Sequence, residues 1–348
     1  MKEFSYRIEA WDILKTFAIF LVIMGHFLQY MVSWPPFECP LFAWIQTFHM
    51  PLFMVISGFL SVRGYAKGNF KAYCKKRFMR IMIPCISWLV LIFLLKASLS
   101  DGGWSFTLLK NVLINDLWFL KSLFICCLLG FIAYNGKNHR VIKVLVTIFI
   151  SQIFWMWNVF TMYPCFLCGA CIYIYWDFLM KNAKWILAIF GLFFITTSFY
   201  ISYTPDFWIV GQGIRRALLS DEMPVESRLN ILLDIVGRRY FTMIIGISAS
   251  VFFILGSYLL FNKIKTRGVL KIMADAGKYT LGIYAAQTVL VENLLVRFIK
   301  ADSAHSTLYV GLIFPCLSII VMIVSVWMNV YIQKNHPVVS AILFGDKK

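Results

Sequence analysis

Residues 13–31 read ILKTFAIFLVIMGHFLQYM, an apolar stretch that carries Lys15 near its start and His26 near its end. A helix needs roughly 20 such residues to cross the hydrocarbon core of a bilayer, so this stretch predicts a transmembrane helix. Acidic as well as basic residues precede it and it lacks a small-residue cleavage site, which favours a retained helix over a signal peptide.

The composition extends this interpretation to the whole chain. Of the 348 residues, 61% are hydrophobic and 14% are charged, whereas a soluble domain has about 25% charged residues. Apolar runs recur without the period-2 alternation of barrel strands, so we predict an all-α polytopic membrane protein with its helices in one bundle. The predicted spans are 13–31, 41–62, 81–99, 117–134, 144–161, 163–180, 185–203, 240–260, 279–298 and 308–332, about ten helices by the length criterion.

No internal repeat, low-complexity tract or long polar linker divides the chain. Residues 1–348 are therefore expected to form a single integral-membrane domain. We expect it in a cell membrane, the bacterial inner membrane, as a multi-pass protein.

The basic residues are unevenly distributed between the predicted spans. The formal net charge of +17 would suggest a nucleic-acid partner in a soluble protein. Here, 22 of the 33 basic residues fall in the segments on the side of the N-terminus. The positive-inside rule therefore predicts that both termini are cytoplasmic, with membrane lipids and no nucleic acid as partners.

One long segment, Thr204–Arg239, is expected on the opposite side of the membrane. From Val225 to Val236 its apolar residues recur at helical spacing with charged residues between them. This pattern predicts an amphipathic helix that lies on the outer surface. Two roles stay open for it: a bilayer anchor, or a roof over a site that opens to the outside.

Three of the nine cysteines, Cys165, Cys168 and Cys171, follow one another at a spacing that resembles a set of metal ligands. They lie within an apolar run, and no second cluster of ligand-type residues occurs elsewhere in the chain. We interpret them as small buried hydrophobic residues and predict no metal site.

Lys15 and His26 are eleven residues apart, which places them on one face of the first helix with about 16 Å of rise between them. Lys15 lies within a turn of the predicted cytoplasmic boundary and can extend its amine to water. His26 lies deeper, where a low dielectric favours a neutral imidazole that can act as a base. A packed histidine with a satisfied hydrogen bond is the alternative.

The second predicted helix contains HMPLFMVISGF at residues 49–59 and runs in the opposite direction. Its His49 is expected about two turns from the outer end, at a depth close to that of His26, so the two rings can share a cavity. Pro51 is expected to kink the helix, and Ser57 with Gly58 to allow close contact with a neighbouring helix. Pro51 and the pair Ser57 and Gly58 can also serve helix packing alone. For His49, as for His26, a packed histidine with a satisfied hydrogen bond is the alternative.

Seven basic residues and no acidic residue occur from Arg63 to Arg80, a stretch that ends in KKRFMR. Lys76 adjoins Arg77, and Arg80 lies about one turn further. Arginine offers planar, bidentate donors to phosphate oxygens, so this cluster can bind phosphate. The other interpretation is orientation by positive charge together with contact to anionic lipids.

Two further predicted helices carry hydrogen-bonding side chains. The sequence NDLWFLKSL at residues 115–123 places Trp118 at the outer boundary, where it serves either a site or an interfacial anchor. The sequence TLGIYAAQ at residues 280–287 sets Tyr284 and Gln287 on one face near the midplane. Both of these groups need partners inside the bundle.

Together these separated motifs resemble the membrane acyltransferase-3 family over most of the chain. Asp12, Lys15 and His26 match the family pattern in the first helix, with lysine in place of the commoner arginine. The other matching positions are residues 49–59, Lys76, Arg77, Arg80 and Pro84, LWFL at 117–120, YPCFLCG at 163–169 and TLGIY at 280–284. The chain departs from the family at Gln287, where members often have histidine.

The resemblance implies an O-acyltransferase that moves an acyl group, acetyl by default, from cytoplasmic acyl-coenzyme A (acyl-CoA) to a hydroxyl of an extracytoplasmic glycan or lipid-linked sugar. It implies acyl-CoA as the donor substrate and no tightly bound cofactor. The residues expected to bind the donor phosphates are Lys15, Lys76, Arg77 and Arg80. An apolar passage along the first helix is then expected to lead the thioester to His26.

In this hypothesis His26 and His49 are the catalytic residues. His26 is expected to act as a general base toward the acceptor hydroxyl, with transfer through an acyl-histidine as the alternative. His49 is also a candidate donor to the oxyanion. The further candidates are Trp118, Tyr284 and Gln287 for oxyanion or acceptor contacts, and Asp12 and Ser57 in support of the neighbouring site residues.

Two other functions compete with acyl transfer. One is a transporter or flippase in which His26 and His49 relay protons, and it would move substrate without acyl-CoA. The other is a non-catalytic membrane assembly or sensor protein. Thermal stabilisation by acyl-CoA but not by adenosine alone would favour the enzyme.

Overall fold

The computed structural model describes residues 9–65, 69–99, 103–136, 139–154, 156–209, 225–261, 267–301 and 306–345. Within these ranges every regular element is a helix, and the only other pairing is an isolated bridge between Val32 and Ala301. The first half contains α1 (Glu9–Tyr30), η1 (Pro36–Glu38), α2 (Pro40–Tyr65), α3 (Phe70–Arg77), η2 (Phe78–Met82), α4 (Ile83–Leu99), α5 (Phe106–Asn115), α6 (Trp118–Tyr134), α7 (Arg140–Ile153), η3 (Met156–Asn158) and α8 (Val159–Ile174).

The second half is also helical. It contains α9 (Trp176–Lys181), α10 (Ala183–Ser202), α11 (Asp206–Ile209), α13 (Val225–Phe261), α14 (Val269–Ala276), α15 (Thr280–Gln287), η5 (Thr288–Leu294), η6 (Leu295–Arg297), α16 (Ser306–Leu308), η8 (Tyr309–Ile313), α17 (Phe314–Asn335) and α18 (Pro337–Phe344). The elements η2, η5 and η8 are single π-helical turns, a form that is frequent at functional sites.

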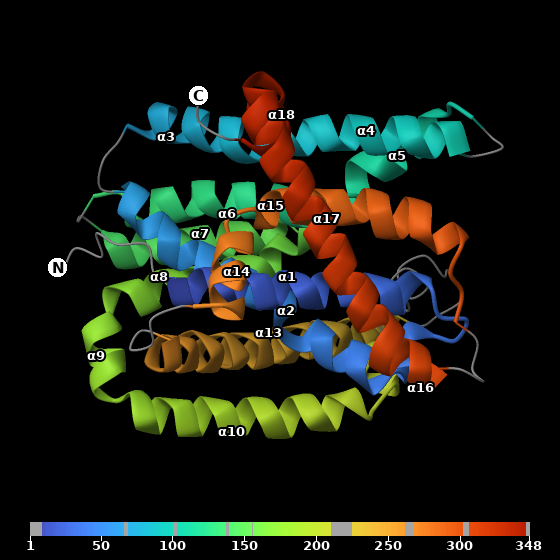
Figure 1. Cartoon of the computed structure of the whole chain (residues 1–348). Helices are drawn as coiled ribbons and strands as arrows, with labels where there is room; N and C mark the ends of the chain where they lie inside the picture. Colours follow the sequence, from blue (N-terminus) through green and yellow to red (C-terminus); the bar gives the residue numbers. More distant parts are fainter. Residues whose placement is uncertain are drawn as a thin grey trace.

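Seven helices in the described part of the chain are long and apolar enough to cross a bilayer. The pair α5 and α6, bent by 53°, adds an eighth if it forms one span. The predicted class, an all-α polytopic membrane protein, is therefore confirmed, while the number of spans is lower than the predicted ten. Figure 1 shows the long helices side by side, with α10 at one edge of the bundle, α3 and α4 at the opposite edge, and α17 crossing obliquely.

Three predicted spans do not form full-length α-helices. The segment 163–180 divides at Tyr175 between α8 and α9. The segment 144–161 divides between α7 and α8, because Trp157 and Asn158 adopt left-handed backbone angles that end the helical path. This leaves α7 with 14 residues, fewer than the roughly 17 that a spanning helix needs. The segment 279–298 is α15 followed by the π-turn of η5 and the 3-10 turn of η6.

The prediction of an amphipathic surface helix within Thr204–Arg239 is wrong for the described residues from Val225 onward. From Val225 the chain forms one continuous helix, α13, which runs 37 residues to Phe261. The apolar residues of this segment are thus the first turns of a long helix whose stretch Leu229–Phe261 qualifies as a membrane span. Residues 210–224 of the predicted segment lie outside the described residues.

Close packing of α2 on α8 holds the centre of the bundle together. A Cβ atom at Gly58 would lie 1.9 Å from the Phe166 carbonyl oxygen, and one at Gly169 would lie 1.9 Å from the Val55 carbonyl oxygen. Only glycine allows the two backbones to approach so closely. The predicted close helix contact at Gly58 is therefore confirmed, and it positions the segment of α2 that carries His49.

The outside of the bundle is apolar. Large side chains such as Trp185 and Phe199 on α10 and Trp327 on α17 are exposed, as expected where helices face lipid. The cysteines differ from the prediction in part, since Cys165 is fully buried but Cys171 is exposed.

We define the inner side of the bundle as the side where α1 begins at Glu9, and the outer side as the side where α1 ends at Tyr30. The inner side corresponds to the predicted cytoplasmic face. Because α2 follows α1 through a short connection, α2 begins on the outer side and ends on the inner side at Tyr65.

Candidate active site

His26 lies near the outer end of α1 and faces an acidic residue from a distant part of the chain. Its Nδ1 atom lies 3.3 Å from Oε1 of Glu292, and the two side chains are only 24% and 11% exposed. The angle of this contact does not make a hydrogen bond in the present conformation. Contacts between catalytic groups often lengthen in this way without substrate, so the pair forms a candidate base and its orienting carboxylate.

Glu292 is held by its own π-helical turn and by Gln287. The amide nitrogen of Gln287, a fully buried side chain, donates to Thr288 Oγ1 at 3.0 Å and to Glu292 Oε1 at 3.4 Å. In a π-turn, residues five apart share one face, and this geometry brings Gln287 and Glu292 together. Gln287 thus lies beside the partner of His26, in the position where the family often has histidine.

The ring of Tyr30 covers the same pair. It stacks on His26 with 5.8 Å between ring centroids and 4° between planes. Its hydroxyl is within hydrogen-bonding reach of Glu292. The aromatic face therefore fixes the imidazole plane relative to the carboxylate.

His49 lies on α2 with 6% of its surface exposed. Its Nδ1 atom is 2.7 Å from the carbonyl oxygen of Ile45, one turn earlier on the same helix. Because a carbonyl can only accept, Nδ1 carries the proton and a neutral His49 keeps a free lone pair on Nε2. His26 and His49 are close enough to interact electrostatically, but neither ring lines one of the two cavities described below.

On the inner side, Lys15 pairs with the nearly buried Asp12 at 2.6 Å and lines a narrow pocket of about 100 Å³. Ser57 lines the same pocket, and Met50 and Tyr284 lie among its other wall residues. Most of the remaining wall is formed by apolar side chains of α1, α2, α6 and α15. Lys15, Ser57 and Tyr284 therefore line one slot, as a thin donor arm would require.

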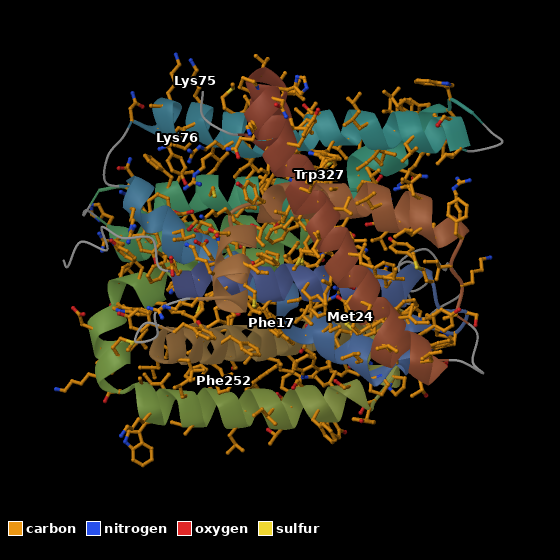
Figure 2. All side chains as sticks on the ribbon, in the orientation of Figure 1. Phe17, Met24, Lys75, Lys76, Phe252 and Trp327 are labelled. Atoms are coloured by element: carbon orange, nitrogen blue, oxygen red, sulfur yellow. The ribbon has the colours of Figure 1, made fainter. Side chains whose placement is uncertain are left out.

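Within the predicted basic cluster, Arg77 is half-buried and contacts residues of the bundle. Its guanidinium donates to Ser61 Oγ at 3.2 Å and lies 5.1 Å from the ring centroid of Tyr73. Ser61 is one turn from Ser57, so Arg77 adjoins the inner pocket. Lys76 and Arg80 are exposed, and Figure 2 shows Lys75 and Lys76 on α3, at the edge of the bundle.

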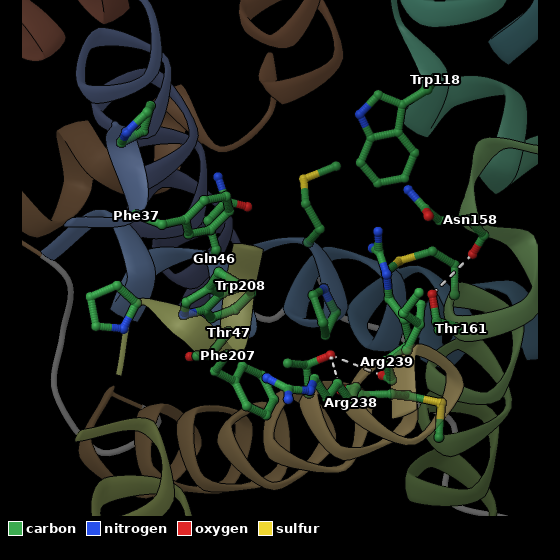
Figure 3. Close-up of a pocket in the computed structure, with 18 of the residues that line it drawn as sticks. Phe37, Gln46, Thr47, Trp118, Asn158, Thr161, Phe207, Trp208, Arg238 and Arg239 are labelled. Atoms are coloured by element: carbon green, nitrogen blue, oxygen red, sulfur yellow. Dashed lines mark hydrogen bonds between the residues drawn. The ribbon is translucent and has the colours of Figure 1, made fainter. Parts of the chain in front are cut away.

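A second and larger cavity, of about 700 Å³, opens on the outer side. Its walls come from η1, α2, the starts of α6 and α8, the turn after α10 and the first part of α13 (Figure 3). Trp118 lines it, directly after Leu117, which has a left-handed φ of 51°. Met50 lines both this outer cavity and the inner pocket, so its side chain lies between the two, next to His49 in the chain.

The sequence predicted an apolar passage along α1 that ends at His26, and the two cavities do not follow this course. Neither cavity is lined by His26, and the inner pocket reaches Met50 and Tyr284 instead. Sequence reasoning also missed Glu292, although an acidic residue inside the predicted span 279–298 was an available signal. The outer cavity was anticipated only through one of the two roles left open for Thr204–Arg239, several of whose residues line it. Its other walls come from separate segments that gave no such signal.

Comparison with known proteins assigns the chain to a family. The acyltransferase-3 family model, described as an acyltransferase domain, matches residues 8–330. The chain belongs to this family. Family membership and the long apolar helices agree with the resemblance of its motifs and with a membrane protein of several spans.

Two curated relatives share part of the chain. The nodulation protein NolL of Mesorhizobium japonicum is 35% identical over 127 residues, which are 34% of this chain and 34% of that protein. The nodulation protein NolL of Sinorhizobium fredii is 33% identical over 136 residues, 36% of each chain. The matches thus span about a third of the length of these relatives. No solved structure matches the chain significantly.

Proposed function

We propose that this acyltransferase moves an acyl group, acetyl by default, from acyl-CoA on the inner side to a hydroxyl of a glycan or lipid-linked sugar on the outer side. Acyl-CoA is a transient donor substrate in this proposal. The observation that carries it is the partly buried pair of His26 and Glu292 at the outer end of α1, the helix whose inner end places Lys15 on the apolar pocket.

The donor enters from the inner side in this proposal. Its phosphates bind at Arg77 and Lys15, and the exposed Lys76 and Arg80 attract them from solution. Arginine suits this role because its planar fork pairs with two phosphate oxygens at once. The thin pantetheine arm then occupies the inner pocket and brings the thioester toward Met50. Because His26 lines neither cavity, the proposal includes a side-chain movement that opens the inner pocket to His26.

The reaction follows from the chemistry of His26. The acceptor oxygen attacks the thioester carbon, and the C–S bond breaks as the tetrahedral intermediate collapses. His26 Nε2 takes the hydroxyl proton and passes it to the leaving sulfur, so that coenzyme A departs as a thiol. Glu292, on the Nδ1 side, stabilises the imidazolium in between, and Gln287 holds Glu292 in place.

His49 and Tyr284 have different roles in this scheme. Since His49 Nδ1 is directed at the Ile45 carbonyl, its neutral Nε2 can accept a proton but cannot donate one. His49 is therefore better suited to orient the acceptor hydroxyl than to bind the oxyanion. Tyr284, on the inner pocket, has a hydroxyl that can donate to the oxyanion.

The test uses the purified full chain in lipid nanodiscs with acetyl-CoA and an envelope glycan fraction. We expect thermal stabilisation by acetyl-CoA but not by adenosine, and transfer of radiolabelled acetyl groups to the glycan. Substrate movement across the membrane without acetyl-CoA, together with no stabilisation by acetyl-CoA, would contradict the proposal and favour a transporter.

A further inference from the structure

The outer cavity contains cations that membrane orientation does not explain. Positive-inside bias places lysine and arginine on the inner side, yet Arg238 and Arg239 follow each other on the wall of this cavity. Figure 3 shows both side chains directed to the same cavity from α13. Their presence on the outer side therefore calls for a local reason.

The two arginines have different surroundings. Arg238 is neutralised by Asp234, whose two carboxylate oxygens lie 3.0 and 2.9 Å from its Nε atom. Its guanidinium also lies 5.4 Å from the ring centroid of Phe207. Arg239 has no ion-pair or hydrogen-bond partner for its guanidinium among the described residues. Glu38, the acidic residue on the cavity wall, forms no ion pair with Arg239 within the same described ranges.

One wall of the cavity suits a sugar ring. Phe37 and Trp208 stack with 4.9 Å between ring centroids and 11° between planes. The Trp208 Nε1 donor is buried, and no hydrogen-bond partner reaches it from the part of the chain that the structure describes. Flat aromatic faces pack against the C–H face of a pyranose, and a buried indole N–H without a partner favours a ligand that supplies an acceptor oxygen.

The opposite wall is polar and close to the transfer point. Asn158, Thr161 and Trp118 line it, and Asn158 has a left-handed φ of 53°. Left-handed backbone in residues other than glycine is uncommon and clusters at ligand sites. A cavity of about 700 Å³ falls in the usual range for ligand sites. Met50 also lines the inner pocket, so one side chain separates a ligand in this cavity from the arriving thioester.

We propose that the outer cavity binds the acyl acceptor and selects one that carries a negative charge, with the sugar ring on Phe37 and Trp208 and the anionic group on Arg239. The inference rests on the proposed function and adds the acceptor class. A guanidinium without a partner in a cavity of partly low dielectric is costly, and an acceptor carboxylate or phosphate offsets this cost. The anion has two chemical sources, an acidic sugar or the phosphate of a lipid carrier.

The experiment measures binding of three defined probes to the full chain in nanodiscs. The probes are glucuronosyl-N-acetylglucosamine, its neutral counterpart glucosyl-N-acetylglucosamine, and farnesyl-diphospho-N-acetylglucosamine. We expect at least one anionic probe to bind about tenfold or more tightly than the neutral disaccharide. The glucuronosyl probe identifies an acidic sugar as the source of the charge, and the farnesyl probe identifies a carrier phosphate.

Variants assign the effect to the cavity. Arg239→Gln should remove the preference for the anionic probe, and Arg239→Lys should retain part of it. Lys300→Gln removes an exposed cation that does not line the cavity, and should leave the preference intact. Equal affinity for charged and neutral probes, or a preference that survives Arg239→Gln, would overturn the inference.

Donor binding separates the two proposals. Stabilisation by acetyl-CoA is measured on the same preparations, since Arg239 does not line the inner pocket that the donor occupies. A wild-type protein that binds acetyl-CoA but shows no anion preference contradicts only the acceptor inference. A protein that fails to bind acetyl-CoA contradicts the proposed function itself.

Discussion

The two ends of α1 hold their ionisable side chains in different ways. At the inner end Lys15 pairs with Asp12, one turn earlier on the same helix. At the outer end His26 meets Glu292, which arrives from η5 near the other end of the chain. Helical spacing alone creates the first pair, whereas the second exists only after η5 packs against α1. In the proposed function the local pair belongs to donor binding, and the tertiary pair belongs to activation of the base.

The strongest test of this comparison is removal of the base. His26→Ala should lower the turnover number for acetyl transfer by about 10²–10⁴-fold, because a positioned general base contributes that much. Binding of acetyl-CoA should persist, since the inner pocket is not lined by His26. His336→Ala, at the exposed start of α18, is the matched control and should retain full transfer. Full transfer by His26→Ala would break the assignment.

The second test removes the charge of the orienting carboxylate. Glu292→Gln should lower the turnover number by about tenfold to a hundredfold, the effect expected for a lost contact to a charged group. The KM for acetyl-CoA should not change, and Glu292→Asp should recover part of the rate. Glu9→Gln, an exposed acid at the inner end, serves as the control. An effect on KM alone would place Glu292 in donor binding instead.

The third test addresses the inner end. Arg77→Ala should raise the KM for acetyl-CoA by about tenfold and leave the saturated rate nearly unchanged, because a charge-assisted contact to phosphate is lost. Lys75→Ala removes a neighbouring exposed cation of α3 and should change neither value. An unchanged donor KM in Arg77→Ala would contradict the clamp, and equal effects of the two substitutions would indicate general surface charge instead.

The fourth test, a substitution in the packing of α2 on α8, is expected to affect stability and to change the rate of acyl transfer least. Gly58→Ala forces a Cβ atom toward the Phe166 carbonyl and should reduce the free energy of unfolding by about 1–3 kcal/mol. Gly311→Ala, where a Cβ atom meets open space, should not destabilise the protein. Unfolding in detergent titrated with denaturant measures both. Equal stability of the two variants would show that the backbones separate at little cost.

The agreement between sequence and structure is greatest where a property is local to one helix. The apolar runs predicted helices such as α1 and α2 within a few residues, because a bilayer requires length and hydrophobicity of any crossing segment. The same reasoning joined residues 144–161 into one span, since apolar content does not reveal the left-handed turn at Trp157 and Asn158. It also separated the start of α13 from its span, because charged residues at helical spacing resemble a surface helix.

The sequence by itself determined that this protein is an all-α membrane protein with the motifs of an acyltransferase family, and that Lys15 and His26 share one helix face. These are consequences of hydrophobicity and of 3.6 residues per turn, which need no knowledge of neighbouring helices. Only the tertiary structure decided that His26 faces Glu292, that Arg77 reaches Ser61, and that Met50 lines both the outer cavity and the inner pocket. Each of these depends on contacts between segments far apart in the chain, and packing selects such contacts in a way that local spacing cannot encode.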